Sequence, residues 1–413
     1  MALWKKFDNA ALVAVLWLVA AGYAAFVAWA HYDGYAAAAR GEMPLYTDYT
    51  PTYAASLLLR EIPAQYLYVQ GAMVEAGRLA AHAMYGGITD EQAHGVGFAP
   101  FMYPPTFILL IAPLAYLPYL LSWFLWLGVT AVPYLAAMRR ILPGLLAWPF
   151  ALAAPPVFYN VMYGQTGFLS AGLIALGLVM LRRNPLWAGV FIGLASVKPH
   201  LGVLIPFALL AGAHWRAFAS AALTVIATII VSLLAFGDDP WFAFIGTGQF
   251  HLQGFAHGAY NYAPMTTVLA TLRLAGVAHA PAMLAQYLSA ALMVALVGAV
   301  WWRGRKRPDL FGLQAAILCL ATPLAVPMMY LYDLVLLVPA AAWLWQDMRE
   351  RGAGHWEYVV LGGAMAALLA VKPLAEAYGI QPGAALIVIL LMLALRRYWL
   401  AWHAPAALSS VRG

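Results

Sequence analysis

The sequence predicts an all-α polytopic membrane protein, and three observations support that fold class. Hydrophobic residues make up 65% of the 413 residues and charged residues only 9%, whereas soluble domains carry about 25% charged residues. The mean hydropathy is +0.79. Apolar runs recur along the chain with basic clusters between them. We therefore expect one integral-membrane domain over residues 1–413, built as a bundle of about 11–12 transmembrane helices that includes a short broken hairpin.

The first apolar run sets the expected orientation of the N-terminus. It covers residues 10–31 and follows Lys5 and Lys6. A cleaved signal peptide has an apolar core of only about 7–15 residues, so we interpret this run as an uncleaved first span. Its basic flank predicts that the N-terminus is cytoplasmic.

The loops between the later apolar runs carry most of the basic residues, and positively charged short loops face the cytoplasm. The clusters are Arg139-Arg140, Arg182-Arg183, residues 214–216, residues 303–307, Arg349 with Arg351, and Arg396-Arg397. All of them become cytoplasmic only if segment 103–118 does not cross the bilayer. That segment contains four prolines and is shorter than the ~20 residues a spanning helix needs. We expect it to re-enter or to lie along the interface.

Two short apolar runs, 186–197 and 199–213, are separated by Pro199 and have basic residues at both outer ends. We expect a broken hairpin that enters from the cytoplasmic side and turns near Lys198. Broken helices at membrane depth are tolerated where they line a protein or water-filled cavity.

The expected layout follows from these assignments. The segments are a first span (10–31), an outer loop with the re-entrant or interfacial segment (32–119), core spans (120–236), a second outer loop (237–282), C-terminal spans (283–395) and a cytoplasmic tail (396–413). The mixed apolar and polar spacing at residues 54–59 and 65–84 predicts amphipathic or juxtamembrane helices in the first loop.

Asp48 is the first candidate for chemistry. It lies in the first outer loop among aromatic and hydroxylated neighbours, with no basic residue between it and Arg60. A carboxylate close to a bilayer face indicates a functional role, and we interpret Asp48 as a general base, with Tyr49 beside it as a pocket candidate. A solvated loop aspartate is the alternative interpretation.

Lys198 is the strongest intramembrane signal. It stands at the break between two apolar half-helices, followed by Pro199 and His200. A fixed cation at a helix break suits an anionic lipid headgroup such as a phosphate, so we expect Lys198 and His200 to bind a donor phosphate. A lysine that snorkels to the surface is the alternative.

Other polar and aromatic side chains are candidates for a substrate pocket. Asp333 is an acid at a membrane edge that needs a partner, such as Lys198, Lys372, a sugar hydroxyl or a helix N-terminus. Asn160 and Gln165 flank an outward turn that either lines a sugar pocket or only caps two helices. The remaining candidates are Tyr103, His257, Asn261 and Tyr332.

Several other functional classes lack their usual motifs. The chain has no Cys/His cluster with zinc spacing, so we expect no metal. It has no phosphate-binding Gly-rich loop followed by lysine and no Gly-x-Ser-x-Gly elbow. Its single cysteine, Cys319, lies in an apolar run and is most simply a packing residue. Basic residues sit at span ends without a basic soluble domain, which argues against nucleic-acid binding.

Taken together, these motifs resemble glycosyltransferase family 87, in the GT-C superfamily of polytopic transferases. The ordered features are Asp48 with the aromatics up to Tyr53; Tyr103-Pro104-Pro105 with Ala112-Pro113-Leu114; residues 160–165; Lys198-Pro199-His200 leading to Trp215-Arg216; and Tyr332-Asp333 before an apolar span. One departure stands in residues 327–333, where some members carry a histidine and this chain has none, so its donor or acceptor choice could differ.

The resemblance implies a metal-independent, inverting hexosyltransferase in the bacterial inner membrane, with its active site facing the periplasm or exterior and no cofactor. Its donor would be a polyprenyl-phosphate monosaccharide, with mannose as the best-known sugar, and its acceptor a lipid or glycan. Asp48 matches the family's first-loop aspartate, the base, and Lys198 matches a lysine near the donor phosphate.

Two rival functions remain open from the sequence. A secondary transporter or lipid flippase also uses broken helices and intramembrane lysines, although transporters usually show an internal repeat and none is evident here. An assembly subunit without an active site is the other alternative. The relative positions of Asp48 and Lys198 discriminate the transferase from the transporter.

Overall fold

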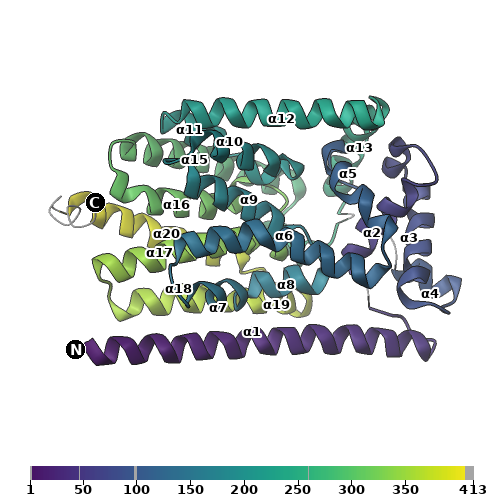
Figure 1. Cartoon of the computed structure of the whole chain (residues 1–413), viewed down its shortest axis with the longest axis horizontal. Coiled ribbons are helices and arrows are strands. Elements are labelled where there is room, and N and C mark those ends of the chain that lie inside the picture. The colour runs from purple at the N-terminus through teal and green to yellow at the C-terminus, as the bar shows by residue number, and fades with distance from the viewer. Residues whose placement is uncertain (1, 46, 97–99, 259, 405–413) are drawn as a thin grey trace.

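The computed structural model describes residues 2–45, 47–96, 100–258 and 260–404, and it is a bundle of helices (Figure 1). These residues contain no named β-strand; the one β-bridge among them joins Met265 to Tyr330. The fold class predicted from composition is confirmed.

The chain begins with one long helix, and a series of short helices separates it from the next long one. In the first half the elements are α1 (Ala2–Ala39), α2 (Tyr49–Leu58), η1 (Ala64–Tyr68), α3 (Gln70–Tyr85), α4 (Asp90–Val96), α5 (Pro105–Ile111), η2 (Ala112–Tyr116), α6 (Tyr119–Ile141), α7 (Ala147–Leu152), α8 (Pro155–Tyr163), α9 (Gly167–Met180), α10 (Pro185–Leu194), η3 (Ala195–Val197), η4 (Pro199–Gly202) and α11 (Ile205–Ala211).

Long helices are more frequent in the second half. The elements there are α12 (Trp215–Phe236), α13 (Asp239–Ala256), α14 (Val268–Leu274), α15 (His279–Gly304), η5 (Pro308–Leu310), α16 (Phe311–Ala325), η6 (Leu331–Leu336), α17 (Leu337–Arg351), α18 (His355–Ala367), η7 (Leu368–Ala370), α19 (Val371–Tyr378) and α20 (Gly383–His403).

Seven segments of the described chain are helical, long and apolar enough to cross a membrane, so the protein is an integral membrane protein. They are Ala10–Ala39, Tyr119–Ile141, Trp215–Phe236, His279–Gly304, Pro308–Ala325, His355–Tyr378 and Gly383–His403. The first continues past residue 31, where the sequence predicted its end. Four shorter apolar helices accompany them: Pro105–Tyr116, Gly167–Met180, Pro185–Val197 and Pro199–Ala211.

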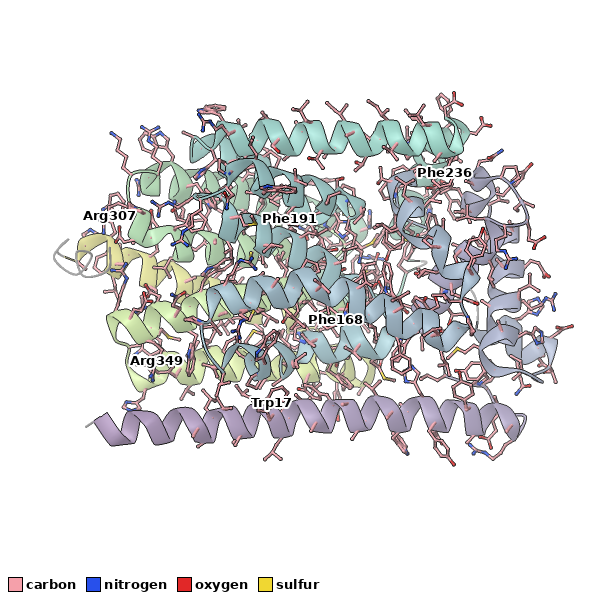
Figure 2. All side chains as sticks on the ribbon, in the orientation of Figure 1. Trp17, Phe168, Phe191, Phe236, Arg307 and Arg349 are labelled. Atoms are coloured by element: carbon pink, nitrogen blue, oxygen red, sulfur yellow. The ribbon has the colours of Figure 1, made fainter. Side chains whose placement is uncertain are left out.

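The bundle has two chemically different ends. Arg307 and Arg349 lie at the end that also holds both chain termini, and Phe236 lies at the opposite end (Figure 2). The helices of the first outer loop, α2 to α5, lie at that opposite end together with α13 (Figure 1). Arg307 and Arg349 are therefore separated from helices α2 to α5 by the length of the bundle.

The first outer loop folds into helices with a hydrophobic core of their own. Tyr49, Leu67, Met73 and Phe107 are fully buried in it, together with side chains from the start of α6. Segment Pro105–Tyr116 packs into this core as two short pieces. A helix of this length spans roughly 18 Å, which is less than the ~30 Å of a bilayer core.

The main core surrounds α16. In the most apolar 18-residue stretch of the span Pro308–Ala325, 78% of the residues are buried, whereas in that of Ala10–Ala39 only 6% are buried. A helix that is apolar on all sides belongs in the centre of a bundle. The outer position of α1 along one side of the bundle (Figure 1) leaves its apolar surface for lipid.

The expected broken hairpin is present in α10 to α11. Its first half begins with Pro185 at the start of α10 and ends where Pro199, which lacks a backbone N–H, interrupts the helix. The two outer ends meet, because Arg182 and Gly212 line the same small cavity. The tip of the hairpin at Lys198 therefore lies far from both ends.

At the end with the termini, a buried charge cluster joins three helices. Arg397 of α20 lies 2.7 Å from Asp347 of α17 and 3.4 Å from Glu357 of α18. Its relative exposure is 4%, against 8% and 3% for the two acids. Asp347 also pairs with Arg351 at 2.8 Å and Glu357 with Arg396 at 2.7 Å, and both of these arginines are more exposed than Arg397. Arg397 is therefore the buried cation of this cluster, and the acids beside it depend on pairing because they are poorly solvated.

We expect Arg397→Met to destabilise the protein by about 3 kcal/mol, since the substitution removes the buried cation between Asp347 and Glu357 and leaves these acids only the more exposed Arg351 and Arg396. Thermal unfolding in detergent measures the effect. Arg349→Met is the matched control, because Arg349 is exposed on the same end of α17 and its substitution should change stability by about 0.5 kcal/mol or less. Equal effects of the two variants would contradict a structural role for the cluster.

Candidate functional site

Asp48 is the N-cap residue of α2, but its side chain does not cap the helix. An aspartate at this position usually accepts a hydrogen bond from the first backbone N–H groups of its helix. Here the Asp48 Oδ2 atom accepts a hydrogen bond of 3.0 Å from Nε2 of Gln165, which lies 117 residues away in the sequence. The carboxylate is therefore directed at the core bundle, and part of its surface stays accessible.

The turn between α8 and α9 holds Gln165 in this position. Gly164 ends α8 in the left-handed conformation, with φ of 66°, which favours glycine. A Cβ atom at Gly167 would clash with the Tyr332 carbonyl oxygen, so only glycine lets α9 start against η6. Asn160 stabilises the turn, because its Oδ1 atom accepts a 2.7 Å hydrogen bond from the Gly167 backbone N–H.

Lys198 at the hairpin tip forms a buried ion pair. Its Nζ atom lies 2.6 Å from Oδ1 of Asp333, and the two side chains are 8% and 2% exposed. Asp333 also accepts a 3.4 Å hydrogen bond from the Tyr330 backbone N–H, which fixes the start of η6. The partner that Asp333 needed is Lys198.

Two tyrosine rings flank the Lys198 ammonium. Its Nζ atom lies 5.0 Å from the ring centre of Tyr332 and 5.7 Å from that of Tyr103, both cation–π distances. The Tyr103 hydroxyl donates a 3.2 Å hydrogen bond to Gln165 Oε1. A chain of contacts thus runs from Asp48 through Gln165 and Tyr103 to Lys198.

Burial raises the pKa of Asp48 above its ordinary value. The Gln165 hydrogen bond and the positive charges of Lys198 and Lys372 oppose part of that rise, and the negative charge of Asp333 adds to it. These four ionisable side chains therefore influence one another across a single region. A carboxylate with a raised pKa is a better proton acceptor than a solvated one.

Lys372 belongs to this region although the sequence suggested it only as a partner for Asp333. Its Nζ atom donates a 2.8 Å hydrogen bond to the hydroxyl of Tyr163, two residues before Gln165. A second contact, with Glu376 at 3.6 Å, is long and partly exposed. Its position 207 residues after Gln165 in the chain gave no local signal of this contact.

Several buried polar atoms near the Gln165 turn find no hydrogen-bond partner among the described residues. They are Asn160 Nδ2, Thr166 Oγ1 and Ser170 Oγ. His200 Nε2, beside Lys198, also lacks a hydrogen-bond partner among the described residues. Buried polar atoms are rarely left unpaired, and each such group needs an explanation. A bound polar ligand would provide one.

The remaining sequence candidates lie elsewhere. Tyr49 is fully buried in the first-loop core, where its hydroxyl bonds Ser122. His257 is exposed and contacts the Gln253 carbonyl of its own helix. Asn261 is exposed and accepts a hydrogen bond from the Ala263 N–H. None of these three contacts reaches Asp48 or Lys198.

Among the residues that the structure describes, no group of three or more His, Cys, Asp or Glu side chains is placed to hold a metal ion. The arrangement combines two carboxylates, one of them paired with Lys198, two ammonium groups and several unpaired amide and hydroxyl atoms. Such a set is suited to accepting a proton, binding an anion and binding hydroxyl groups.

Comparison with known proteins relates this arrangement to one family. The model of glycosyltransferase family 87 matches residues 101–330. One curated protein, the polyprenol-phosphate-mannose-dependent alpha-(1-2)-phosphatidylinositol pentamannoside mannosyltransferase of Mycobacterium tuberculosis (strain CDC 1551 / Oshkosh), is 26% identical over 322 residues, covering 72% of this chain and 70% of that protein. No solved structure gives a significant match.

We expect Lys198→Met to destabilise the protein by about 3–5 kcal/mol, because it leaves the buried Asp333 carboxylate unpaired. The double variant Lys198→Met with Asp333→Asn should lose less than the sum of the two single losses, by about 0.5–3 kcal/mol. Thermal unfolding in detergent measures all three variants. Lys372→Met serves as the control, since its partly exposed ion pair should contribute about 1 kcal/mol or less. Strictly additive losses would contradict the pairing.

Proposed function

Because this chain belongs to glycosyltransferase family 87, we propose that it transfers a hexose from a polyprenyl-phosphate sugar to a lipid or glycan acceptor at the outer membrane face. The name of the curated mycobacterial relative, which depends on polyprenol-phosphate-mannose, supports this donor class. Mannose is the first sugar to test. The absence of a histidine from residues 327–333 keeps other hexoses under consideration.

One observation carries the proposal. The Asp48 side chain does not cap helix α2 and instead faces the region that contains Lys198. Two side chains, those of Gln165 and Tyr103, connect Asp48 to Lys198. We infer that an acid and a cation joined through only two side chains contact opposite ends of one glycosyl phosphate. Family membership and this pairing together favour a transferase over a transporter or flippase.

In the proposed reaction, Asp48 is the base. The carboxylate accepts the proton of the acceptor hydroxyl as that oxygen forms a bond to the anomeric carbon of the donor sugar. The bond between the anomeric carbon and the phosphate oxygen breaks, and the polyprenyl phosphate leaves with the electron pair. Attack opposite the leaving group inverts the anomeric configuration, and no metal takes part.

Two cations support departure of the phosphate. Lys198 uses one of its three N–H donors on Asp333, so its others are available to a phosphate oxygen. Since Asp333 already neutralises Lys198, the ammonium of Lys372 supplies the additional positive charge. Charge that develops on the leaving oxygen is stabilised strongly where water is excluded.

The unpaired atoms of the Gln165 turn suit the sugar. Asn160 Nδ2 is a donor, and the hydroxyls of Thr166 and Ser170 both donate and accept. Sugar hydroxyl groups would satisfy them, and they would do so without displacing the Asn160 bond to Gly167. We include these three residues in the proposed sugar pocket.

The proposed sidedness follows from charge. Arg307 and Arg349, which belong to two of the basic clusters, lie at the end of the bundle that holds both termini (Figure 2), and this is the cytoplasmic end if positive loops face inward. The first outer loop and Asp48 then face the exterior, in a bacterial inner membrane. Donor and acceptor would meet in the bilayer plane, which lowers the entropic cost of bringing them together.

We expect Asp48→Asn to lower sugar transfer at least about 100-fold, because an amide cannot accept the acceptor proton. The assay supplies purified protein with a panel of polyprenyl-phosphate sugars and identifies glycosylated lipids by mass spectrometry. Asp33→Asn, at an exposed acid near the end of α1, should retain normal transfer. Full activity of Asp48→Asn would refute the base assignment, and no product from any donor in the wild-type protein would refute the transferase.

We expect transfer to fall as pH decreases through the raised pKa of Asp48, since only the carboxylate form accepts a proton. Gln165→Leu removes a hydrogen bond that lowers this pKa, so the acid limb of the rate profile should move to higher pH. Gln346→Leu, which removes a hydrogen bond to Glu350 on α17, should leave the profile unchanged. An acid limb that stays in place in Gln165→Leu would show that another group controls it.

A further inference from the structure

A cavity of about 810 Å³ lies in the first-loop end of the bundle, and neither Asp48 nor Lys198 lines it. Three segments form its walls. They are the turn after α2 with the start of η1, the 3-10 helix η2, and the last residues of α12 up to Phe236. Figure 2 marks Phe236 at the end of the bundle opposite the basic loops. Small-molecule sites typically have about 300–1,000 Å³, so this cavity has room for a ligand.

Of the described residues that line this cavity, Arg60 alone carries a charged side chain. Its guanidinium lies 5.3 Å from the ring centre of Tyr116, which holds it in a cation–π contact. Its Nη1 atom donates a 3.4 Å hydrogen bond to the Ala115 carbonyl. An arginine has five N–H donors, and the others of Arg60 have no partner among the described residues.

The other arginines of the first outer loop are neutralised. Arg40 is paired with Glu42 at 2.7 Å, and Arg78 with both Glu75 and Asp90 at 2.6 and 2.8 Å. Arg60 has no carboxylate within ion-pair distance in the described parts of the chain. The cavity therefore presents an uncompensated cation in a planar fork geometry, which matches the oxygens of a phosphate.

The cavity is located at the end of a candidate span. Helix α12 is among the seven segments able to cross a membrane. Only 17% of the residues in its most apolar 18-residue stretch are buried. Near the cavity, Val231 is 50% exposed and Leu234 is 83% exposed. In Figure 1, α12 runs along the outer side of the bundle. A lipid could lay its acyl chains on this surface with its headgroup at the level of Arg60.

We propose that this cavity binds the phosphate headgroup of an anionic membrane phospholipid, held by the Arg60 guanidinium, with the acyl chains along α12. The charge of Arg60 favours an anionic group, and the position of the cavity at the end of a span with an exposed apolar surface favours a lipid over a soluble partner. The proposal is independent of the transferase chemistry. Its readout is lipid binding rather than sugar transfer.

The test uses the full-length protein in detergent, titrated with phosphatidylglycerol, and native mass spectrometry counts the lipids that remain bound. The wild type should retain one more tightly bound phosphatidylglycerol than Arg60→Gln, whose affinity at this site should fall roughly tenfold. Ala235→Trp, which fills the cavity from α12 and keeps Arg60, should lose the same lipid. Because the two variants alter different segments, a folding defect in one leaves the other informative.

Arg40→Gln is the matched control, since it removes a first-loop arginine that does not line the cavity, and it should retain the wild-type number of lipids. Equal retention by the wild type, Arg60→Gln and Ala235→Trp would overturn the proposal. A similar loss in Arg40→Gln would overturn it as well, by showing a general charge effect. Displacement of the lipid by millimolar inorganic phosphate would identify a site for free phosphate instead.

Discussion

The Lys198 ammonium and the Asp333 carboxylate lie 2.6 Å apart with almost no exposure to solvent, and the centre of this protein depends on that contact. Removing either charge from water costs several kcal/mol. The tip of the broken hairpin and the start of η6 must therefore stay together. The contact also positions Tyr332 and Tyr103 beside the ammonium, and through Tyr103 it reaches Gln165 and Asp48.

This ion pair also shapes the chemistry available to a membrane glycosyltransferase. A lysine that is already neutralised attracts phosphate less strongly than a free one, so the proposed reaction assigns the additional positive charge to Lys372. Asp48, in contrast, has no cation at ion-pair distance in the described residues and takes its hydrogen bond from a neutral amide. Its pKa is raised mainly by burial. Two uncharged side chains, Gln165 and Tyr103, thus separate the Asp48 carboxylate from the neutralised ion pair.

Much of the fold could be predicted because hydrophobicity and charge act locally along the chain. The apolar runs predicted spans, Pro199 between two short runs predicted the hairpin, and the basic loops predicted which segments share one end of the bundle. Asp48, Lys198 and Asp333 were singled out because ionisable groups near a bilayer are costly. Tyr49, His257 and Asn261 were selected as polar or aromatic candidates for a pocket, and their contacts with distant residues could not be predicted from residue type. Tyr49 packs in a core, and the other two bond nearby backbone groups.

The sequence by itself determined that this chain is a helical membrane protein, where its helices break and which charged residues require partners, because these depend on the transfer of short segments from water. Only the tertiary structure decided which partners those residues find. Lys198 and Asp333 are 135 residues apart, and Asp48 and Gln165 are 117 apart. No local pattern encodes such contacts, because they arise from helix packing that depends on the shapes of many side chains together.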